Sequence, residues 1–198
     1  MFFDNSASYI IIRHIEDLGK GAIFDIDDCT GLGISYTHLR SIFVDLLSKR
    51  RITRIARGLY CNPRIENGKY VNPNLDSILK YIAKKNNFEY CAANEYAEYI
   101  LGLRENLPNI INCYITGKIK YVNLTSGQQI AFSPRKRAFT NSFSSYELLV
   151  LFNYISLESN QELSKQAIEV LKTKDWMLNA TNEDKLVFKK IKADYLFK

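Results

Sequence analysis

The sequence lacks most of the residues and motifs on which enzymes depend. It has only two histidines, and none of its four cysteines forms a C-x-x-C pair. The phosphate-binding, dinucleotide-binding, zinc-protease and nucleophile-elbow motifs (GxxxxGK[ST], GxGxxG, HExxH and GxSxG) are all missing. No acid stands two residues before a lysine at the end of an apolar strand, an arrangement that many nucleases require. We therefore expect a protein that is not an enzyme, with no metal site and no cofactor.

Long apolar runs are missing as well. No segment approaches the roughly 18 apolar residues that are needed to cross a bilayer, and Met1–Asp4 does not begin a signal peptide. We expect a cytoplasmic protein without membrane contact. In that reducing compartment, Cys29, Cys61, Cys91 and Cys113 are expected to be free thiols. A zinc site or disulfide bonds are the alternative.

Acidic residues are scarce in two stretches that carry most of the positive charge. Residues 40–57 hold six basic residues and one acid, and residues 118–137 hold five basic residues and no acid. The rest of the chain has 16 basic and 20 acidic residues, although the net charge of the whole is +6. Positive charge gathered in this way favours a polyanionic partner. Two solvated hairpins would give the same pattern.

The first sixty residues predict a helical unit followed by a β-hairpin. Apolar residues recur at helical spacing, Ser35 is an expected N-cap, and the last segments alternate apolar and polar residues. The expected elements are helices at 6–18, 25–29 and 36–49, a turn at 30–33, and strands at 22–24, 52–55 and 59–61. This order of helices and hairpin is that of a winged helix-turn-helix.

The remainder of the chain predicts a second, mixed domain. Residues 62–75 contain two prolines, one glycine and four asparagines, which indicates a linker or long loop. Helices are expected at 76–86, 91–103, 144–157, 161–173 and 181–195, and three strands of a small antiparallel sheet at about 110–133. The predicted fold class is α+β, with a winged helix-turn-helix domain at 1–66 and an α+β domain at 67–198.

The candidate DNA-binding residues follow from this arrangement. A recognition helix uses its first turns to reach base edges in the major groove, and arginine can form a bidentate contact with guanine. Cations on a wing gain affinity from the phosphate backbone. The expected contacts are Ser35, Tyr36, Thr37, Arg40 and Ser41 on the helix, Lys49, Arg51, Arg54 and Arg57 at its end and on the wing, and Lys118, Lys120, Arg135, Lys136 and Arg137 in the second basic stretch. His38 could join them, and a lysine-protected hairpin edge is the alternative for the second stretch.

Two acidic groups offer weaker candidates for chemistry. Asp25, Asp27 and Asp28 could serve a metal-dependent nuclease, but carboxylates also stabilise the start of a helix. Glu95 and Glu98 share one face of a predicted helix, where a solvated surface is the simpler interpretation. A winged helix used only to dock a protein partner is the remaining alternative to DNA binding.

The segment from Phe43 to Pro63 resembles the wing signature of AbiEi-type antitoxins and their DUF6088 relatives. It reads F-x-x-L-x-x-x-x-R-I-x-R-x-x-R-G-L-Y-x-x-P, and Arg50 stands where the family usually has a glycine. The later segments Ala92–Asn94, Leu101–Leu103 and Tyr114–Gly117 fit the same family order. The resemblance implies a bacterial or mobile-element repressor that binds double-stranded DNA at its own operator. It also implies a nucleotidyltransferase-like toxin as the partner, and a palindromic operator would suit a homodimer.

Overall fold

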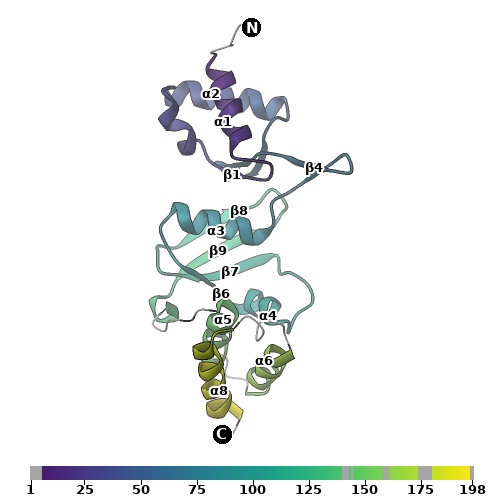
Figure 1. The fold of residues 1–198 in the computed structure, drawn as a ribbon, viewed down its shortest axis with the longest axis vertical. Helices are drawn as coiled ribbons and strands as arrows, with labels where there is room; N and C mark the ends of the chain where they lie inside the picture. Colours follow the sequence, from purple (N-terminus) through teal and green to yellow (C-terminus); the bar gives the residue numbers. More distant parts are fainter. Residues whose placement is uncertain (1–5, 140–142, 144, 158–160, 174–179, 197–198) are drawn as a thin grey trace. The chain divides into compact units, whose positions relative to one another are not determined.

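The computed structural model describes residues 6–139, 143, 145–157, 161–173 and 180–196. The chain divides into two compact units, and Figure 1 shows the elements of each. The N-terminal unit comprises Met1–Asn86 with Asn123–Ser126, and the C-terminal unit comprises Asn87–Val122 with Gly127–Lys198. The fold is mixed α+β, with small sheets in both units and helices towards the C-terminus.

The N-terminal unit contains three α-helices, one 3₁₀ helix and five short strands among its described residues. They are α1 (Ala7–Asp17), β1 (Ile23–Phe24), η1 (Asp27–Leu32), α2 (Tyr36–Ser48), β2 (Thr53–Ala56), β3 (Leu59–Cys61), β4 (Arg64–Glu66), β5 (Lys69–Val71) and α3 (Leu75–Lys85). The predicted helices at 6–18 and 36–49 and the predicted hairpin are confirmed. The brief helix predicted at 25–29 is wrong in its bounds, because Asp25 caps η1 from outside by accepting from the backbone N–H groups of Asp27 and Asp28.

An aromatic cluster forms the centre of this unit. The antiparallel sheet has the order β1-β3-β2, and Phe24 of β1 pairs in register with Tyr60 of β3. The ring of Phe43 on α2 meets both at an angle of about 75°, with centroids 6.0 and 5.0 Å away. Edge-to-face aromatic contacts of this kind add stability beyond the area they bury. They fix one face of α2 against the sheet.

The segment at 62–75, predicted as a linker or long loop, instead contains a buried asparagine and a β-hairpin. Asn62 is buried, and its amide donates to the carbonyls of Ile15 and Gly19, both at 2.9 Å, so it ties β3 to the end of α1. Beyond it, β4 and β5 form a two-stranded antiparallel hairpin. Asn67 and Gly68 at its tip have φ values of 50° and 74°, as a type I′ turn requires. Asparagine and glycine thus mark a tight turn here, not a flexible linker.

The predicted domain boundary after residue 66 is too early. It falls at the end of β4, whereas the N-terminal unit continues through α3. The reason is a polar network that joins α3 to η1: Lys85 contacts Asp25 at 2.9 Å and Asp28 at 2.7 Å, and the hydroxyl of Tyr81 donates to Asp28. These contacts span more than fifty residues of sequence, which no local pattern can reveal.

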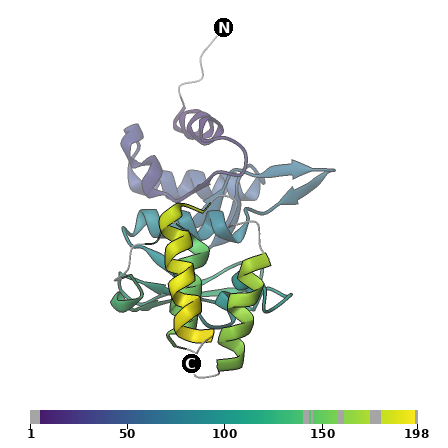
Figure 2. The same ribbon diagram turned by 60° about the horizontal axis from the view of Figure 1, so that its bottom comes forward.

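The C-terminal unit combines a four-stranded sheet with helices. Its described elements are β6 (Tyr90–Ala92), α4 (Asn94–Leu101), β7 (Ile110–Ile115), β8 (Lys120–Asn123), β9 (Gln129–Pro134), η2 (Lys136–Phe139), α5 (Tyr146–Ile155), α6 (Gln161–Thr173) and α8 (Asn182–Leu196). The three C-terminal helices confirm the prediction, although residue 144, the first of the helix predicted at 144–157, lies outside the described residues. Helices α6 and α8 contact each other and α5 (Figure 2).

The sheet differs from the predicted antiparallel one in two respects. Its strand order is β6-β7-β9-β8, and β7 and β9 run parallel. The apolar strand β9 takes the inner position, whereas the half-exposed β8 lies at the edge and forms part of the connection between the parallel strands. The added strand β6 occupies the start of the helix predicted at 91–103, because Cys91 and Ala92 pair with β7.

Among the described residues, no helix combines the length and apolar character that crossing a bilayer requires. All four cysteines are buried and free.

Candidate nucleic-acid interface

Helix α2 presents its first turns to solvent. Ser35 caps the helix by accepting from the backbone N–H of His38 at 3.4 Å. Apolar side chains on the opposite face, including Leu39 and Phe43, are buried in the core. The predicted contact residues of this helix are all exposed: Ser35, Tyr36, Thr37, Arg40 and Ser41, together with His38. Polar groups that can reach a ligand therefore gather at one end of a firmly packed helix.

The β2–β3 hairpin carries two further cations. Arg54 and Arg57 are exposed, and Gly58 closes the turn with a φ of 75°. The segment Asn123–Ser126 holds the outer edge of β2: the backbone N–H of Thr125 donates to the carbonyl of Ile55 at 2.8 Å, and its hydroxyl donates to that of Arg54 at 3.1 Å. The backbone beneath Arg54 is thus fixed on both sides, since β3 pairs with its other edge.

An open hollow of about 580 Å³ lies between these elements of the N-terminal unit. Arg54 lies over the ring of Tyr60, with its guanidinium carbon 5.9 Å from the ring centroid. This cation–π contact orients the arginine without neutralising it. The residues that line the hollow are Asp25, Ile26, Asp27, Tyr36, Arg40, Arg54, Arg57, Gly58 and Tyr60.

The hollow brings together four of the predicted DNA-contact residues and adds Tyr60, which the sequence analysis missed. Tyr36, Arg40, Arg54 and Arg57 all line it, although they are up to 21 positions apart in the chain. Tyr60 was expected only as a strand residue; its place two residues after Gly58 in the hairpin is the signal that could have found it. Asp27 adds one carboxylate, so the hollow holds three guanidinium groups and two carboxylates, counting Asp25.

The other predicted cations of this unit lie elsewhere. Helix α2 is 13 residues long, which places Lys49 about 20 Å from Tyr36 along the helix. Lys49 also forms an ion pair with Asp45 at 2.8 Å. Arg51 follows the end of the helix and is exposed. Neither residue lines the hollow, and their contact with DNA stays a prediction.

The second basic stretch belongs to the C-terminal unit. β8 and β9 are neighbouring strands joined by a short turn, so the start of β8 and the end of β9 lie at the same end of the sheet. Lys118 and Lys120 are therefore near Arg135, whose guanidinium carbon is 4.9 Å from the ring centroid of Tyr114. Lys136 and Arg137 follow in η2 and are exposed. The five cations form one basic end of this sheet.

The acidic cluster of η1 has a structural role in the network with α3. Burial alone would raise the pKa of Asp28, but hydrogen bonds from Lys85, Tyr81 and the backbone of Asp25 outweigh it and lower that pKa. Burial would lower the pKa of Lys85, and its bonds to both carboxylates raise it instead. Among the residues that the structure describes, no group of histidine, cysteine and acidic side chains is arranged to hold a metal ion.

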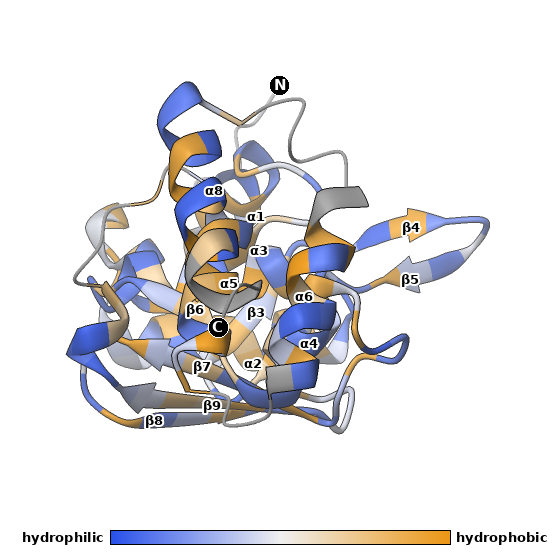
Figure 3. Cartoon of the chain, turned by 90° about the horizontal axis from the view of Figure 1, so that it is seen from below, coloured by the Kyte–Doolittle hydropathy of each residue, from blue (hydrophilic) through white to orange (hydrophobic). Residues whose placement is uncertain are grey.

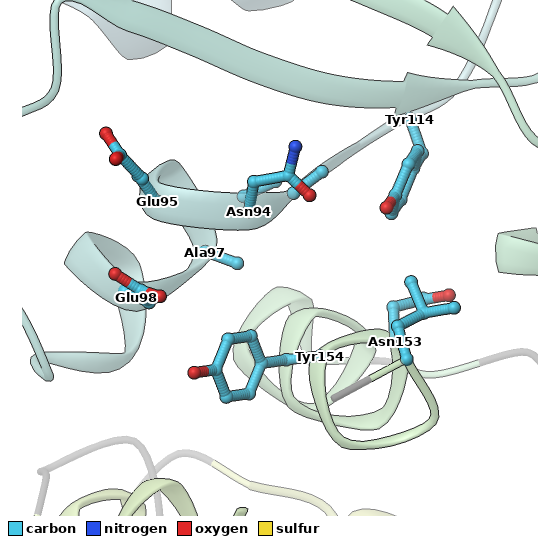
Figure 4. A pocket seen from close by; sticks show the side chains of 10 residues that line it. Asn94, Glu95, Ala97, Glu98, Tyr114, Asn153 and Tyr154 are labelled. Carbon is cyan, nitrogen blue, oxygen red and sulfur yellow. The ribbon is translucent and has the colours of Figure 1, made fainter. Parts of the chain in front are cut away.

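Glu95 and Glu98 border a separate pocket of about 260 Å³ in the C-terminal unit. Figure 4 shows the two carboxylates at one end of this pocket, with Tyr114 and Asn153 at the other. Both glutamates contact Arg104, at 3.4 and 3.3 Å. Both carboxylates are thus engaged in ion pairs with one arginine. This geometry favours the structural interpretation.

The comparisons with known proteins identify a family. A sequence profile described as "Family of unknown function (DUF6088)" matches residues 10–141, which is two-thirds of the chain. The match begins in α1, includes the hollow and the second basic stretch, and ends after η2. A search of curated proteins returns no match. The chain therefore belongs to DUF6088, a family whose function is unknown.

Proposed function

We propose that the N-terminal unit is a winged helix-turn-helix that binds double-stranded DNA. In this proposal α2 is the recognition helix and the β2–β3 hairpin is the wing. The observation that carries it is the hollow, where Arg40 of α2 meets Arg54 and Arg57 of the hairpin. Two elements that both contact a duplex in this class of proteins thus bring their cations to one place.

The arginines have different tasks in this arrangement. Arg40 lies one turn into the exposed face of α2, where a side chain can reach a base edge and its guanidinium can recognise guanine. Arg54 and Arg57 lie on the hairpin and would contact phosphates, which position the protein and supply affinity without reading sequence. Asp25 and Asp27 also line the hollow and would repel phosphate, so the strand of DNA would pass on the arginine side.

The proposal is tested by fluorescence anisotropy with the full chain and labelled duplex DNA from upstream of its own gene. We expect binding that prefers this DNA to a shuffled duplex of equal length and that weakens steeply as salt rises. The triple variant Arg40→Ala, Arg54→Ala, Arg57→Ala should lose both properties. No salt-sensitive, site-preferring binding by the wild type would overturn the proposal, and a stoichiometric protein partner that copurifies without DNA would favour a docking module instead.

We further propose that the protein represses its own operon and acts as the antitoxin of a toxin–antitoxin pair. Support comes from the resemblance of residues 43–63 to AbiEi-type antitoxins, which implies a nucleotidyltransferase-like toxin encoded nearby. The test is co-expression with the product of the neighbouring reading frame in a growth assay. We expect the chain to relieve growth arrest by that product. A neighbouring gene of unrelated type, or arrest that the chain does not relieve, contradicts the antitoxin role and leaves DNA binding standing.

A further inference from the structure

The β4–β5 hairpin is an exposed arm of the N-terminal unit. Every residue from Arg64 to Val71 is exposed, and the two strands pack extensively only on each other among the described elements. Its apolar side chains are also open to water: the exposed fractions of Ile65 and Tyr70 are 62% and 48%. An isolated two-stranded hairpin is marginal in water, and a free strand edge is a template for pairing with another chain.

The register of the hairpin defines what its free edge offers. Glu66 pairs with Lys69 across the two-residue turn, so this pair carries the hydrogen bonds of the turn. Because hydrogen-bonded and non-bonded pairs alternate in an antiparallel ladder, the next pair, Ile65 with Tyr70, is a non-bonded one. The N–H and C=O groups of Ile65 therefore point outward, along the free edge of β4.

We propose that β4 pairs antiparallel with β4 of a second copy of this chain, about a two-fold axis at Ile65. The outward N–H and C=O groups of the two Ile65 residues then bond each other, and the two hairpins become one four-stranded sheet. One face of this sheet aligns Ile65 and Tyr70 of both copies, which covers part of the exposed apolar surface. Figure 3 shows β4 as hydrophobic at its centre and hydrophilic at both ends.

The charges of β4 are self-complementary in this pairing. When the strand Arg64-Ile65-Glu66 lies antiparallel to its own copy, Arg64 faces Glu66 of the second copy, and the same pair recurs on the other side of the axis. Within one chain the two side chains already form an ion pair, so their charges suit each other. The edge of β5 has no such match, because Lys69 would face Val71.

The interface is small, so the association is weak. Three residues from each strand bury far less than the roughly 1,200 Å² of a stable complex. We therefore expect a monomer–dimer equilibrium that is visible only at high protein concentration. This self-pairing does not depend on the DNA binding proposed above, and it is tested without DNA.

Analytical ultracentrifugation with charge-reversed chains tests the pairing. Arg64→Glu places two glutamates opposite each other, and Glu66→Arg places two arginines opposite each other, so each variant should remain monomeric where the wild type dimerises. An equimolar mixture of the two variants restores opposite charges at both positions and should recover dimers. Arg13→Glu, an equal charge change at an exposed site on α1, should dimerise as the wild type does.

Cysteine cross-linking tests the register. Directly opposed residues in a hydrogen-bonded pair have Cα atoms about 5.5 Å apart, which a disulfide can bridge. Ile65→Cys should therefore form a covalent dimer under mild oxidation, and the four buried native cysteines should not interfere. Tyr70→Cys should stay monomeric, because two strands separate it from its copy. A monomeric wild type at all concentrations, dimers that survive both charge reversals, or efficient cross-linking only through Tyr70→Cys would overturn the proposal.

Discussion

At the scale of single residues, the arginines of the hollow differ in what they are expected to do for DNA binding. Arg54→Ala and Arg57→Ala should each weaken binding to all duplexes alike and reduce the slope of log K against log salt by about 1, because each removes one phosphate contact. Arg40→Ala should instead reduce the preference for the specific duplex, by about 1–3 kcal/mol. Anisotropy titrations with specific and shuffled DNA at several salt concentrations separate the two effects.

A matched control comes from a cation outside the hollow. Lys80 on α3 is exposed and pairs with Asp76, so Lys80→Ala removes the same charge from the same unit without touching α2 or the hairpin. It should leave affinity and slope close to those of the wild type. Equal losses from Lys80→Ala and Arg54→Ala would mean that net charge alone drives binding.

Asp28 gives the N-terminal unit a stability that depends on pH. The pKa of its carboxyl is lowered from 3.8, chiefly because Lys85 and Tyr81 hydrogen-bond its charged form against the effect of burial. A lowered pKa stabilises the folded state above the unfolded value and ceases to do so as the pH falls through the folded value. Asp28→Asn should therefore destabilise the protein by about 1 kcal/mol at pH 7, a modest figure because the network is partly exposed.

Thermal melts between pH 7 and pH 3 measure this contribution. We expect the difference in Tm between the wild type and Asp28→Asn to persist down to about pH 4 and to shrink below 3.8. Asp27→Asn, the same change one residue earlier, is the control, since Lys85 contacts Asp25 and Asp28. A Tm difference that is constant to pH 3 would show that Asp28 acts through packing and not through its charge.

At the scale of elements, the C-terminus of α2 has a capping motif with an unusual residue. The backbone N–H of Arg50 donates to the carbonyl of Leu47 at 3.0 Å, and that of Arg51 to the carbonyl of Leu46 at 2.8 Å. These two bonds define a Schellman motif, whose left-handed position is usually glycine. Arg50 occupies it with a φ of 55°.

The strain at Arg50 is measurable by comparing two substitutions that remove the same charge. Arg50→Gly removes the Cβ atom that is strained in the left-handed conformation, whereas Arg50→Ala keeps that Cβ atom and its strain. We expect the glycine variant to be the more stable of the two by about 1 kcal/mol in urea unfolding, because left-handed backbone disfavours a Cβ atom. If the alanine variant is equally or more stable, the cap does not impose this conformation in solution.

Local patterns explain which elements the sequence could predict. Helices α1 and α2 have serine caps and apolar stripes, and the turn of the β2–β3 hairpin has a glycine at positive φ, so each is encoded within a few residues. Strand β6 and the parallel pairing of β7 with β9 depend on partners far along the chain. The hairpin at 64–71 was hidden because Asn67-Gly68 is typical both of a loop and of a tight turn.

At the scale of the whole molecule, the candidate site could be predicted in its parts but not in its assembly. Tyr36, Arg40, Arg54 and Arg57 were identified individually from residue type and from their places on the helix and the hairpin, whereas Tyr60 was missed. Lys49 and Arg51 were expected at the end of the helix, but the sequence could not show which cations share one hollow, since that depends on how α2 packs against the hairpin. The domain boundary was missed for a similar reason, because the contacts of Tyr81 and Lys85 with η1 leave no local signal.

The two basic stretches make the salt dependence of DNA binding a test of the whole chain. Together they hold 11 basic residues and one acid, whereas the rest of the protein has an excess of acids. If the basic end of the C-terminal sheet also contacts phosphates, removing Lys118, Lys120, Lys136 and Arg137 with alanine should reduce the slope of log K against log salt by about 3–4. Site preference should persist, because these contacts carry no sequence information. A slope equal to that of the wild type would confine DNA binding to the N-terminal unit.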